Sequence, residues 1–203
     1  METIEAYLAA LSSKDPTPGG GSAATLVGAM AAALVAMVAR ITAQNPVHAG
    51  RADEASNVAS EADALREALL AARVADEAAY GRVVAAMALS RDSAAEKAVR
   101  RDAVQLALAG AAAAPLRAAE LALDTLRVAT RAEALGNTHL QSDVDCAFVF
   151  ANASLAASAF NVRINHAYLK DDALIESQES ALGAIERLAA VITAKWSRPG
   201  APP

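Results

Sequence analysis

The sequence has few of the side chains that usually bind metals or nucleic acids. Its three histidines are scattered and lack the spacing of a zinc site, so we expect no metal. The net charge is −5 and no basic stripe occurs, which argues against a nucleic-acid partner. The single cysteine, Cys146, excludes an internal disulfide, and we expect it to be a small buried residue of a cytoplasmic protein.

Aromatic residues make up only 3% of the chain and β-branched runs are short, so that alanine dominates and helices are favoured throughout. No internal repeat, linker or convincing strand stands out. Residues 1–203 therefore predict an all-α, single-domain bundle of long antiparallel helices, with a frayed tail over 198–203. Because each alanine buries little apolar area, such a bundle needs long helix contacts or a partner subunit, and we expect a homodimer.

Hydrophobic periodicity predicts the helices, and prolines, glycines and capping residues predict where they end. The expected helices span 3–12, 22–43, 48–89, 94 to about 111, a segment from there to 135, 142–169 and 173–196. Pro115 is expected to kink or restart the chain, because proline lacks a backbone donor. Ser93 and Glu96 fit a capping box.

The helix predicted over 22–43 is the most apolar segment. Residues 23–39 are slightly short for a membrane span, and acidic residues precede them where a signal peptide needs basic ones. We interpret the segment as a buried central helix, with no membrane partner. Ala24, Gly28 and Ala32 recur at steps of four, which predicts a face for very close helix packing, and we expect such faces to form the dimer interface.

A glycine-rich loop, Asp15-Pro16-Thr17-Pro18-Gly19-Gly20-Gly21-Ser22, leads into this helix. Ser22 is a natural N-cap, and the glycines leave the N–H groups of the helix start without covering side chains. Such a helix start favours a carboxylate, a phosphate or a flat ligand that touches the main chain. An ordinary glycine-rich turn is the alternative.

A line of polar residues runs down the otherwise apolar helix over 142–169. Ser154, Ser158, Asn161 and Asn165 lie at steps of four and three, so they share one face. Buried polar groups need partners, so this face meets either other helices of the bundle or a ligand. Continued toward the helix start, the same face reaches Asp143.

Three acidic residues are candidates for chemistry or for capping. We assign Asp145 to a capping box with Ser142, which leaves Asp143 as the better chemical candidate. Asp76 and Tyr80 form a polar pair at i and i+4 in the helix over 48–89, and a solvated pair is the simpler interpretation of it.

Four segments that together cover nearly the whole chain carry a family resemblance. They are SSKDPTPGGGSAATLVGAMAAALVAMVARIT (residues 12–42), DEAAY (76–80), GNTHLQSDVDCA (136–147) and NVRINHAYLKD (161–171). In order and spacing they resemble the formimidoyltetrahydrofolate cyclodeaminase / methenyltetrahydrofolate cyclohydrolase family, which includes the C-terminal domain of formiminotransferase-cyclodeaminase. The first and fourth segments are the specific ones. His139 stands where relatives often carry asparagine.

The resemblance implies an all-helical, dimeric, cofactor-free enzyme that acts on a folate one-carbon adduct. Residue by residue, it implies a catalytic group formed by Asp143, Asn161 and Asn165. It also implies a set of substrate-binding residues: Gly19, Gly20, Gly21, Ser22, Asp76, Tyr80 and Asp171.

Two folate reactions fit this resemblance, and so does a non-catalytic role in folate binding. A cyclohydrolase opens the cationic ring of 5,10-methenyltetrahydrofolate with water to give 10-formyltetrahydrofolate. A cyclodeaminase closes that ring on formimidoyltetrahydrofolate and releases ammonia, and a separate formiminotransferase could then be a partner. We favour the cyclohydrolase because no transferase domain is attached. A folate-binding scaffold protein of the same fold, without catalytic activity, is the alternative.

Overall fold

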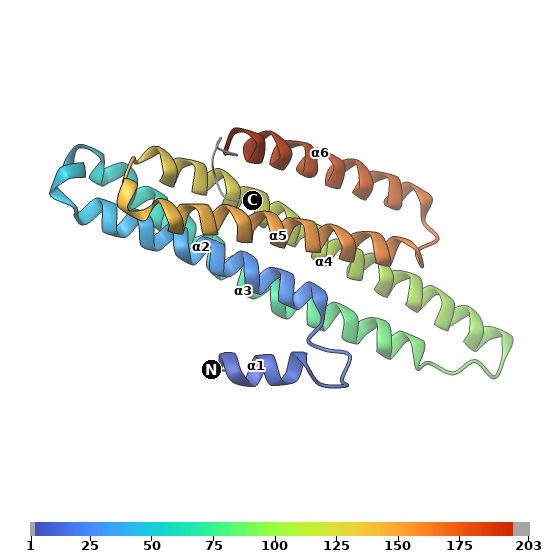
Figure 1. Ribbon diagram of the computed structural model, residues 1–203. Helices are drawn as coiled ribbons and strands as arrows, with labels where there is room; N and C mark the ends of the chain where they lie inside the picture. Colours follow the sequence, from blue (N-terminus) through green and yellow to red (C-terminus); the bar gives the residue numbers. More distant parts are fainter. Residues whose placement is uncertain (1–2, 197–203) are drawn as a thin grey trace.

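The computed structural model describes residues 3–196, and the regular structure in this range is entirely helical (Figure 1). The α-helices are α1 (Ile4–Leu11), α2 (Gly20–Gln44), α3 (Ala52–Met87), α4 (Ala94–Ala134), α5 (Gln141–His166) and α6 (Asp172–Trp196). Two 3₁₀ turns, η1 (Pro46–Arg51) and η2 (Thr138–Leu140), join α2 to α3 and α4 to α5. The all-α prediction is confirmed, and the predicted tail over 198–203 lies outside the described residues.

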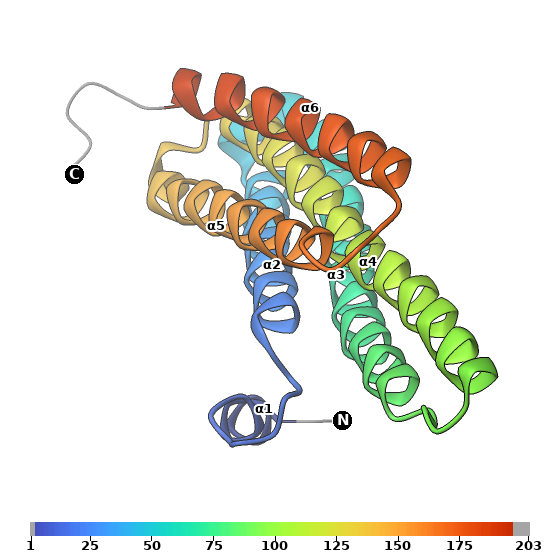
Figure 2. The ribbon, with the colours of Figure 1, turned by 90° about the vertical axis from the view of Figure 1, so that its right-hand side faces the viewer.

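Four long helices form the body of the molecule. α2 packs against α3 and α5, and α4 packs against the same two helices from the other side. α6 lies along α4 and α5, whereas α1 is set apart from the body, beyond the start of α2 (Figures 1 and 2). The core between the helices is made largely of alanine, with a few larger side chains such as Val35, Leu126 and Phe148.

The apolar helix α2 is central, as the sequence predicts. Its single charged residue, Arg40, pairs with Asp63 of α3 at the edge of the helix contact. By length and composition, three helical stretches are apolar enough to cross a membrane: α2, α4 and Thr138–His166. In α2, 61% of the most apolar window is buried inside the bundle, which accounts for its hydrophobicity by packing.

The face formed by Ala24, Gly28 and Ala32 packs closely, but it does so inside the chain. A Cβ atom on Gly28 would lie 2.6 Å from Ser154 Oγ of α5 and 3.1 Å from a methyl carbon of Leu69 in α3. The predicted close packing is therefore confirmed. The expectation that this face forms a dimer interface is wrong, because α3 and α5 of the same chain already cover it.

Two other expectations fail for reasons of packing. α4 runs through Pro115 without a break, because its neighbours bury it on both sides and the carbonyl that the proline leaves without a donor is paired elsewhere. Cys146 is exposed, because it lies on the outer side of α5. The capping box of Ser93 and Glu96 is present as predicted, with both reciprocal hydrogen bonds formed.

Gly28 and Gly81 offer a matched test of this packing. Gly28→Ala should lower the free energy of unfolding by about 1–3 kcal/mol, because the new methyl group overpacks the seam between α2 and α5. Gly81 lies within α3 with open space around its Cβ position, so Gly81→Ala should raise that free energy by about 0.5–1 kcal/mol. Urea denaturation of both variants measures the difference, and a neutral Gly28→Ala would contradict the close approach.

Candidate active site

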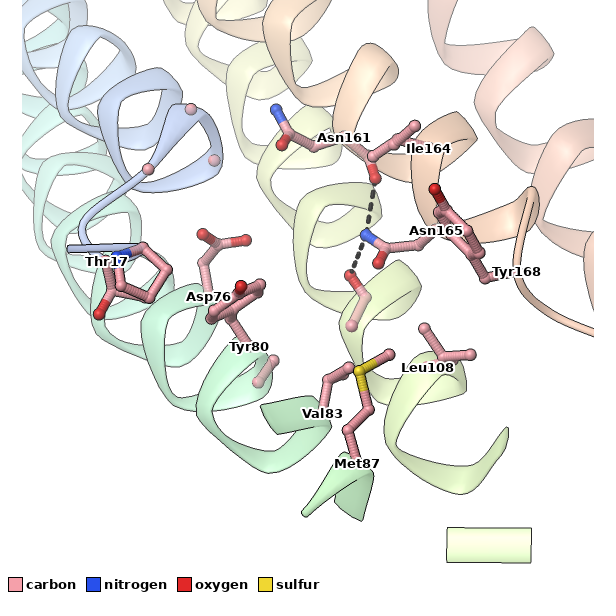
Figure 3. Close-up of a pocket in the computed structure, with 16 residues that line it drawn as sticks. Thr17, Asp76, Tyr80, Val83, Met87, Leu108, Asn161, Ile164, Asn165 and Tyr168 are labelled. Atoms are coloured by element: carbon pink, nitrogen blue, oxygen red, sulfur yellow. Dashed lines mark hydrogen bonds between the residues drawn. The ribbon is translucent and has the colours of Figure 1, made fainter. Parts of the chain in front are cut away.

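A pocket of about 350 Å³ opens between the start of α2, the second half of α3, the middle of α4 and the end of α5 (Figure 3). Its walls are largely apolar and include Ala79, Val83, Met87, Leu108, Ala111 and Ile164. Its polar side chains are Thr17, Asp76, Tyr80, Asn161, Asn165 and Tyr168. Asp76 is the only charged residue among them, so the pocket offers a largely apolar space with one acidic group.

The glycine-rich loop forms one wall of this pocket through Pro16, Thr17 and Gly19. The helix begins earlier than predicted, because Gly19, with an extended backbone, is the N-cap residue. The prediction that Ser22 caps the helix is therefore wrong. Ser22 lies in the first turn, fully buried, and its hydroxyl donates to Glu77 Oε1 of α3 at 2.7 Å. The side chain thus serves a contact between helices instead of the helix end.

Asp76 occupies the space that the glycines leave open at the start of α2. A Cβ atom on Gly21 would lie 2.5 Å from both carboxylate oxygens of Asp76, so only glycine allows this approach. The backbone N–H of Ser22 donates to the same carboxylate. The anion expected at this helix start is thus supplied by the protein itself.

The pKa of Asp76 is raised above its ordinary value. Burial is the main cause, because it disfavours the charged form, and the neighbouring negative charge of Glu77 adds to it. The N–H of Ser22 acts in the opposite direction but does not outweigh them. A carboxyl group with a raised pKa takes up a proton more readily than an ordinary aspartate, which suits a role in proton transfer.

Two asparagines of α5 face the pocket across from Asp76 (Figure 3). Asn165 Nδ2 donates to the carbonyls of Ala111 at 3.0 Å and Asn161 at 2.8 Å. These bonds use both of its hydrogens, so its Oδ1 is left as an acceptor. Asn161 Nδ2 donates to the carbonyl of Ala157 at 2.8 Å, which leaves it one N–H and its Oδ1.

The polar line along α5 divides into two parts. Ser154 and Ser158 are fully buried, and their hydroxyls have no hydrogen-bond partner within residues 3–196. Asn161 and Asn165 line the pocket instead. The expected hydrogen bonding between helices is found at Asn165, which donates to the Ala111 carbonyl of α4, and not at the two serines. Because the asparagines also line the pocket, contact with a ligand there stays a prediction.

The structure does not bring Asp143 to this pocket. It lies in the first turn of α5, 18 residues before Asn161, which places it about 27 Å away along the helix. The capping box assigned to Asp145 and Ser142 is wrong, because α5 begins at Gln141 after the N-cap Leu140. Asp145 instead accepts a hydrogen bond from Gln141 Nε2 at 2.8 Å.

Of the predicted substrate-binding residues, five line the pocket: Gly19, Gly20, Gly21, Asp76 and Tyr80. Ser22 lies directly behind this wall. Asp171 does not line the pocket, and its Oδ1 accepts the N–H of Leu174 at 3.0 Å at the start of α6. His139 is exposed in η2 and is not among the lining residues.

A buried polar network behind Asp76 was not predicted. Because Ser22 gives its one hydroxyl hydrogen to Glu77, the Tyr7 hydroxyl, 2.9 Å from Ser22 Oγ, must be the donor in that pair. The Arg73 guanidinium lies 5.0 Å from the centre of the Tyr7 ring and 3.7 Å from Glu77 Oε1. This network ties α1 to α2 and α3, and so holds the loop between α1 and α2 that forms the pocket wall.

Comparisons with known proteins agree with this arrangement. Residues 3–184 match the family described as formiminotransferase-cyclodeaminase. A methenyltetrahydrofolate cyclohydrolase from Methylorubrum extorquens is 34% identical over 177 residues, which make up 87% of this chain and 85% of that protein. A crystal structure of formiminotetrahydrofolate cyclodeaminase from Thermotoga maritima matches with a TM-score of 0.77 and 24% identity, over 94% of both chains.

The fold and these matches place the chain among the all-helical enzymes of folate one-carbon metabolism. Within them, the chain belongs to the formiminotransferase-cyclodeaminase family. The resemblance stated from the four sequence segments is confirmed.

The two neighbouring glycines at the start of α2 should respond differently to the same substitution. Gly21→Ala should displace the Asp76 carboxylate and abolish ligand binding or turnover. Gly20→Ala should be mild, because its Cβ would lie 3.7 Å from Asn161, an ordinary contact distance. Isothermal titration with a tetrahydrofolate derivative measures affinity, and circular dichroism checks that helix content is unchanged. Equal effects of the two substitutions would contradict the assigned geometry.

Proposed function

We propose that this chain is a methenyltetrahydrofolate cyclohydrolase. The observation that carries the proposal is the single acidic group, Asp76, set into an otherwise uncharged and largely apolar pocket. The substrate of this reaction is a conjugated cation, so a largely apolar pocket with one carboxyl group suits its apolar ring and its charge. The 34% identity to a protein named as a methenyltetrahydrofolate cyclohydrolase supports the same choice.

Asp76 is the proposed acid–base group. It takes a proton from the water that attacks the methenyl carbon, which forms a tetrahedral carbon between N5 and N10. It then returns that proton to N5 as the bond between N5 and this carbon breaks. The hydroxyl proton of the intermediate is lost to solvent, and the formyl group stays on N10. A raised pKa suits both transfers, because the carboxyl group then takes up a proton more readily than an ordinary aspartate does.

The asparagines orient the reacting groups in this proposal. Asn165 Oδ1 accepts a hydrogen bond from the attacking water or from a ring N–H, and the free N–H of Asn161 donates to the oxygen that becomes the formyl group. The side chains of Tyr80, Val83 and Met87 contact the flat ring. Neither proton transfer calls for a metal or a further cofactor, and we propose that the reaction proceeds without one in the cytoplasm.

The cyclodeaminase reaction is the second candidate, because the raised pKa of Asp76 also provides the acid that departing ammonia requires. In that reaction N10 attacks the formimidoyl carbon, and the N10 proton passes to the imino nitrogen. This nitrogen then takes a second proton from Asp76 and leaves as ammonia, which gives the methenyl cation. A separate formiminotransferase would then supply the substrate. Absorbance changes of the purified protein with 5,10-methenyltetrahydrofolate, and separately with formimidoyltetrahydrofolate, distinguish the two reactions. A protein that binds folate but turns over neither substrate would be a scaffold.

Asp76 and Asp143 form a matched pair for testing the acid–base assignment. Asp76→Asn should lower kcat by about 10²–10⁴, because a general acid–base group is lost while the shape of the side chain is kept. Asp143→Asn makes the same chemical change about 27 Å away along α5 and should leave kcat within a factor of about two. Should Asp143→Asn be the damaging substitution, catalysis lies with Asp143, and the pocket around Asp76 is not the site.

We also propose that the chain is a homodimer, paired through α2 and α5. Large apolar side chains are exposed on these adjacent helices: Met30, Met37 and Ile41 on α2, and Val149 and Phe160 on α5. In a twofold dimer the same surface faces itself, so a charge close to the axis would repel its own copy. α2 carries no charge from Gly20 to Ala39, which suits a face that meets a second copy of itself.

Met37→Glu tests this interface. It would bury one charge from each copy in an apolar interface, and light scattering at micromolar concentration should show a shift from dimer to monomer. Val99→Glu is the control, because Val99 is exposed on α4, away from the proposed face. A monomeric wild-type protein, or equal dissociation of both variants, would refute the assignment.

A further inference from the structure

Pro115 lies in the middle of α4, a helix of 41 residues that continues through it. Proline has no backbone N–H, so the carbonyl of Ala111, four residues earlier, has no donor within the helix. The proline is buried, and an unpaired carbonyl in such a place is unfavourable. The Ala111 carbonyl, on the buried side of α4, therefore needs a hydrogen-bond donor from outside the helix.

A side chain of the proposed active site supplies this donor. Asn165 Nδ2, from α5, donates to the Ala111 carbonyl at 3.0 Å, and both residues line the pocket (Figure 3). The second hydrogen of the same amide goes to the carbonyl of Asn161 at 2.8 Å. Two carbonyls on the nitrogen side fix the orientation of the amide, since a flipped amide would place oxygen against oxygen. Asn165 Oδ1 is therefore the atom that remains for a ligand.

We propose that Pro115 is a positioning residue for Asn165. Because Pro115 has no N–H, the Ala111 carbonyl is free to accept a hydrogen bond from Asn165 Nδ2. This bond orients the amide so that Asn165 Oδ1 points toward the hydrogen-bond donor of the substrate or of the attacking water. The importance of Pro115 for turnover rests on the proposed function of the pocket. The effect of Pro115 on the orientation of the Asn165 amide is independent of that function.

A purely structural role is the alternative. Pro115 could serve only to shape α4 for packing against α3 and α5, with the contact to Asn165 as a by-product. Replacing it would then change stability, and any change in substrate binding would not depend on Asn165. The two roles therefore differ in whether the effects of residues 115 and 165 are coupled.

Pro115→Ala is the direct test, because alanine restores an N–H that can donate to the Ala111 carbonyl within the helix. We expect a higher midpoint of thermal unfolding, since proline is unfavourable inside a helix. We also expect the KM for methenyltetrahydrofolate to rise about three- to tenfold, the effect of weakening one hydrogen bond. Pro46→Ala is the matched control, because Pro46 is exposed at the start of η1. It should leave KM unchanged and should not raise the unfolding midpoint.

A double-mutant cycle separates positioning from packing. In an Asn165→Ala background, Pro115→Ala should no longer change KM, because the side chain that it positions is absent. An equal rise in KM in both backgrounds would overturn the proposal and assign Pro115 to packing alone. An unchanged KM in the single variant would also overturn it, because the carbonyl would then accept both donors.

A readout independent of turnover completes the test. The side-chain amide signals of Asn165 can be assigned in an NMR spectrum by their loss in Asn165→Ala. Their hydrogen exchange should become at least several-fold faster in Pro115→Ala and stay unchanged in Pro46→Ala. Unchanged exchange in Pro115→Ala refutes the positioning role even if the protein is an active cyclohydrolase. Faster exchange in a protein that turns over neither folate supports the positioning role and removes only the proposed reaction.

Discussion

The close approach of α2 to its neighbours is the constraint on which the rest of this structure depends. Gly21 lies against Asp76 of α3 and Gly28 against Ser154 of α5, each so closely that a methyl group would clash. With almost no aromatic residues, the chain gains its cohesion from many short contacts between backbones and small side chains. These contacts tolerate little added volume, because a new methyl group must displace the buried side chain that it meets: Asp76 at Gly21, and Ser154 and Leu69 at Gly28.

The pocket lies where this seam ends. Along part of α5, helix α2 covers the polar residues of that face, as Gly28 does at Ser154. Near the first residues of α2 this contact ends, and the next polar residues of the same face, Asn161 and Asn165, line the pocket. There the positive end of the α2 dipole meets the Asp76 carboxylate, while burial and Glu77 work against its ionisation. The balance of these forces gives the site one carboxyl group with a raised pKa.

Much of the fold was predictable from the sequence, because long periodic segments determine helix type well. The bounds of α1, α2, α5 and α6 lie within three residues of those predicted. The family segments also identified the glycines, Asp76 and the asparagines that meet in the pocket. Periodicity shows which residues share a face, but not how far along that face a pocket extends. That is why Asp143 was grouped with Asn161 although most of α5 separates them.

Other errors arose where a partner distant in sequence overrides a local preference. Ser22 looks like an N-cap, but Glu77, 55 residues away, takes its hydroxyl. Pro115 looks like a helix end, but Asn165, from another helix, pairs the carbonyl that it leaves free. Asp76 looks like a solvated acid in a long helix until the start of α2 is placed over it. In each case the deciding contact depends on the tertiary arrangement, which local patterns do not contain.

The attachment of α1 has a consequence for how the molecule opens. Tyr7 is the only buried residue of this helix, whereas Ile4 and Leu8 are mostly exposed. Undocking α1 would therefore expose little apolar surface and leave no cavity in the four-helix body. We therefore expect the release of α1 to be a local unfolding event that costs less free energy than unfolding of the whole bundle. Because the loop after α1 forms a wall of the pocket, we expect such an event to open the region beside Asp76.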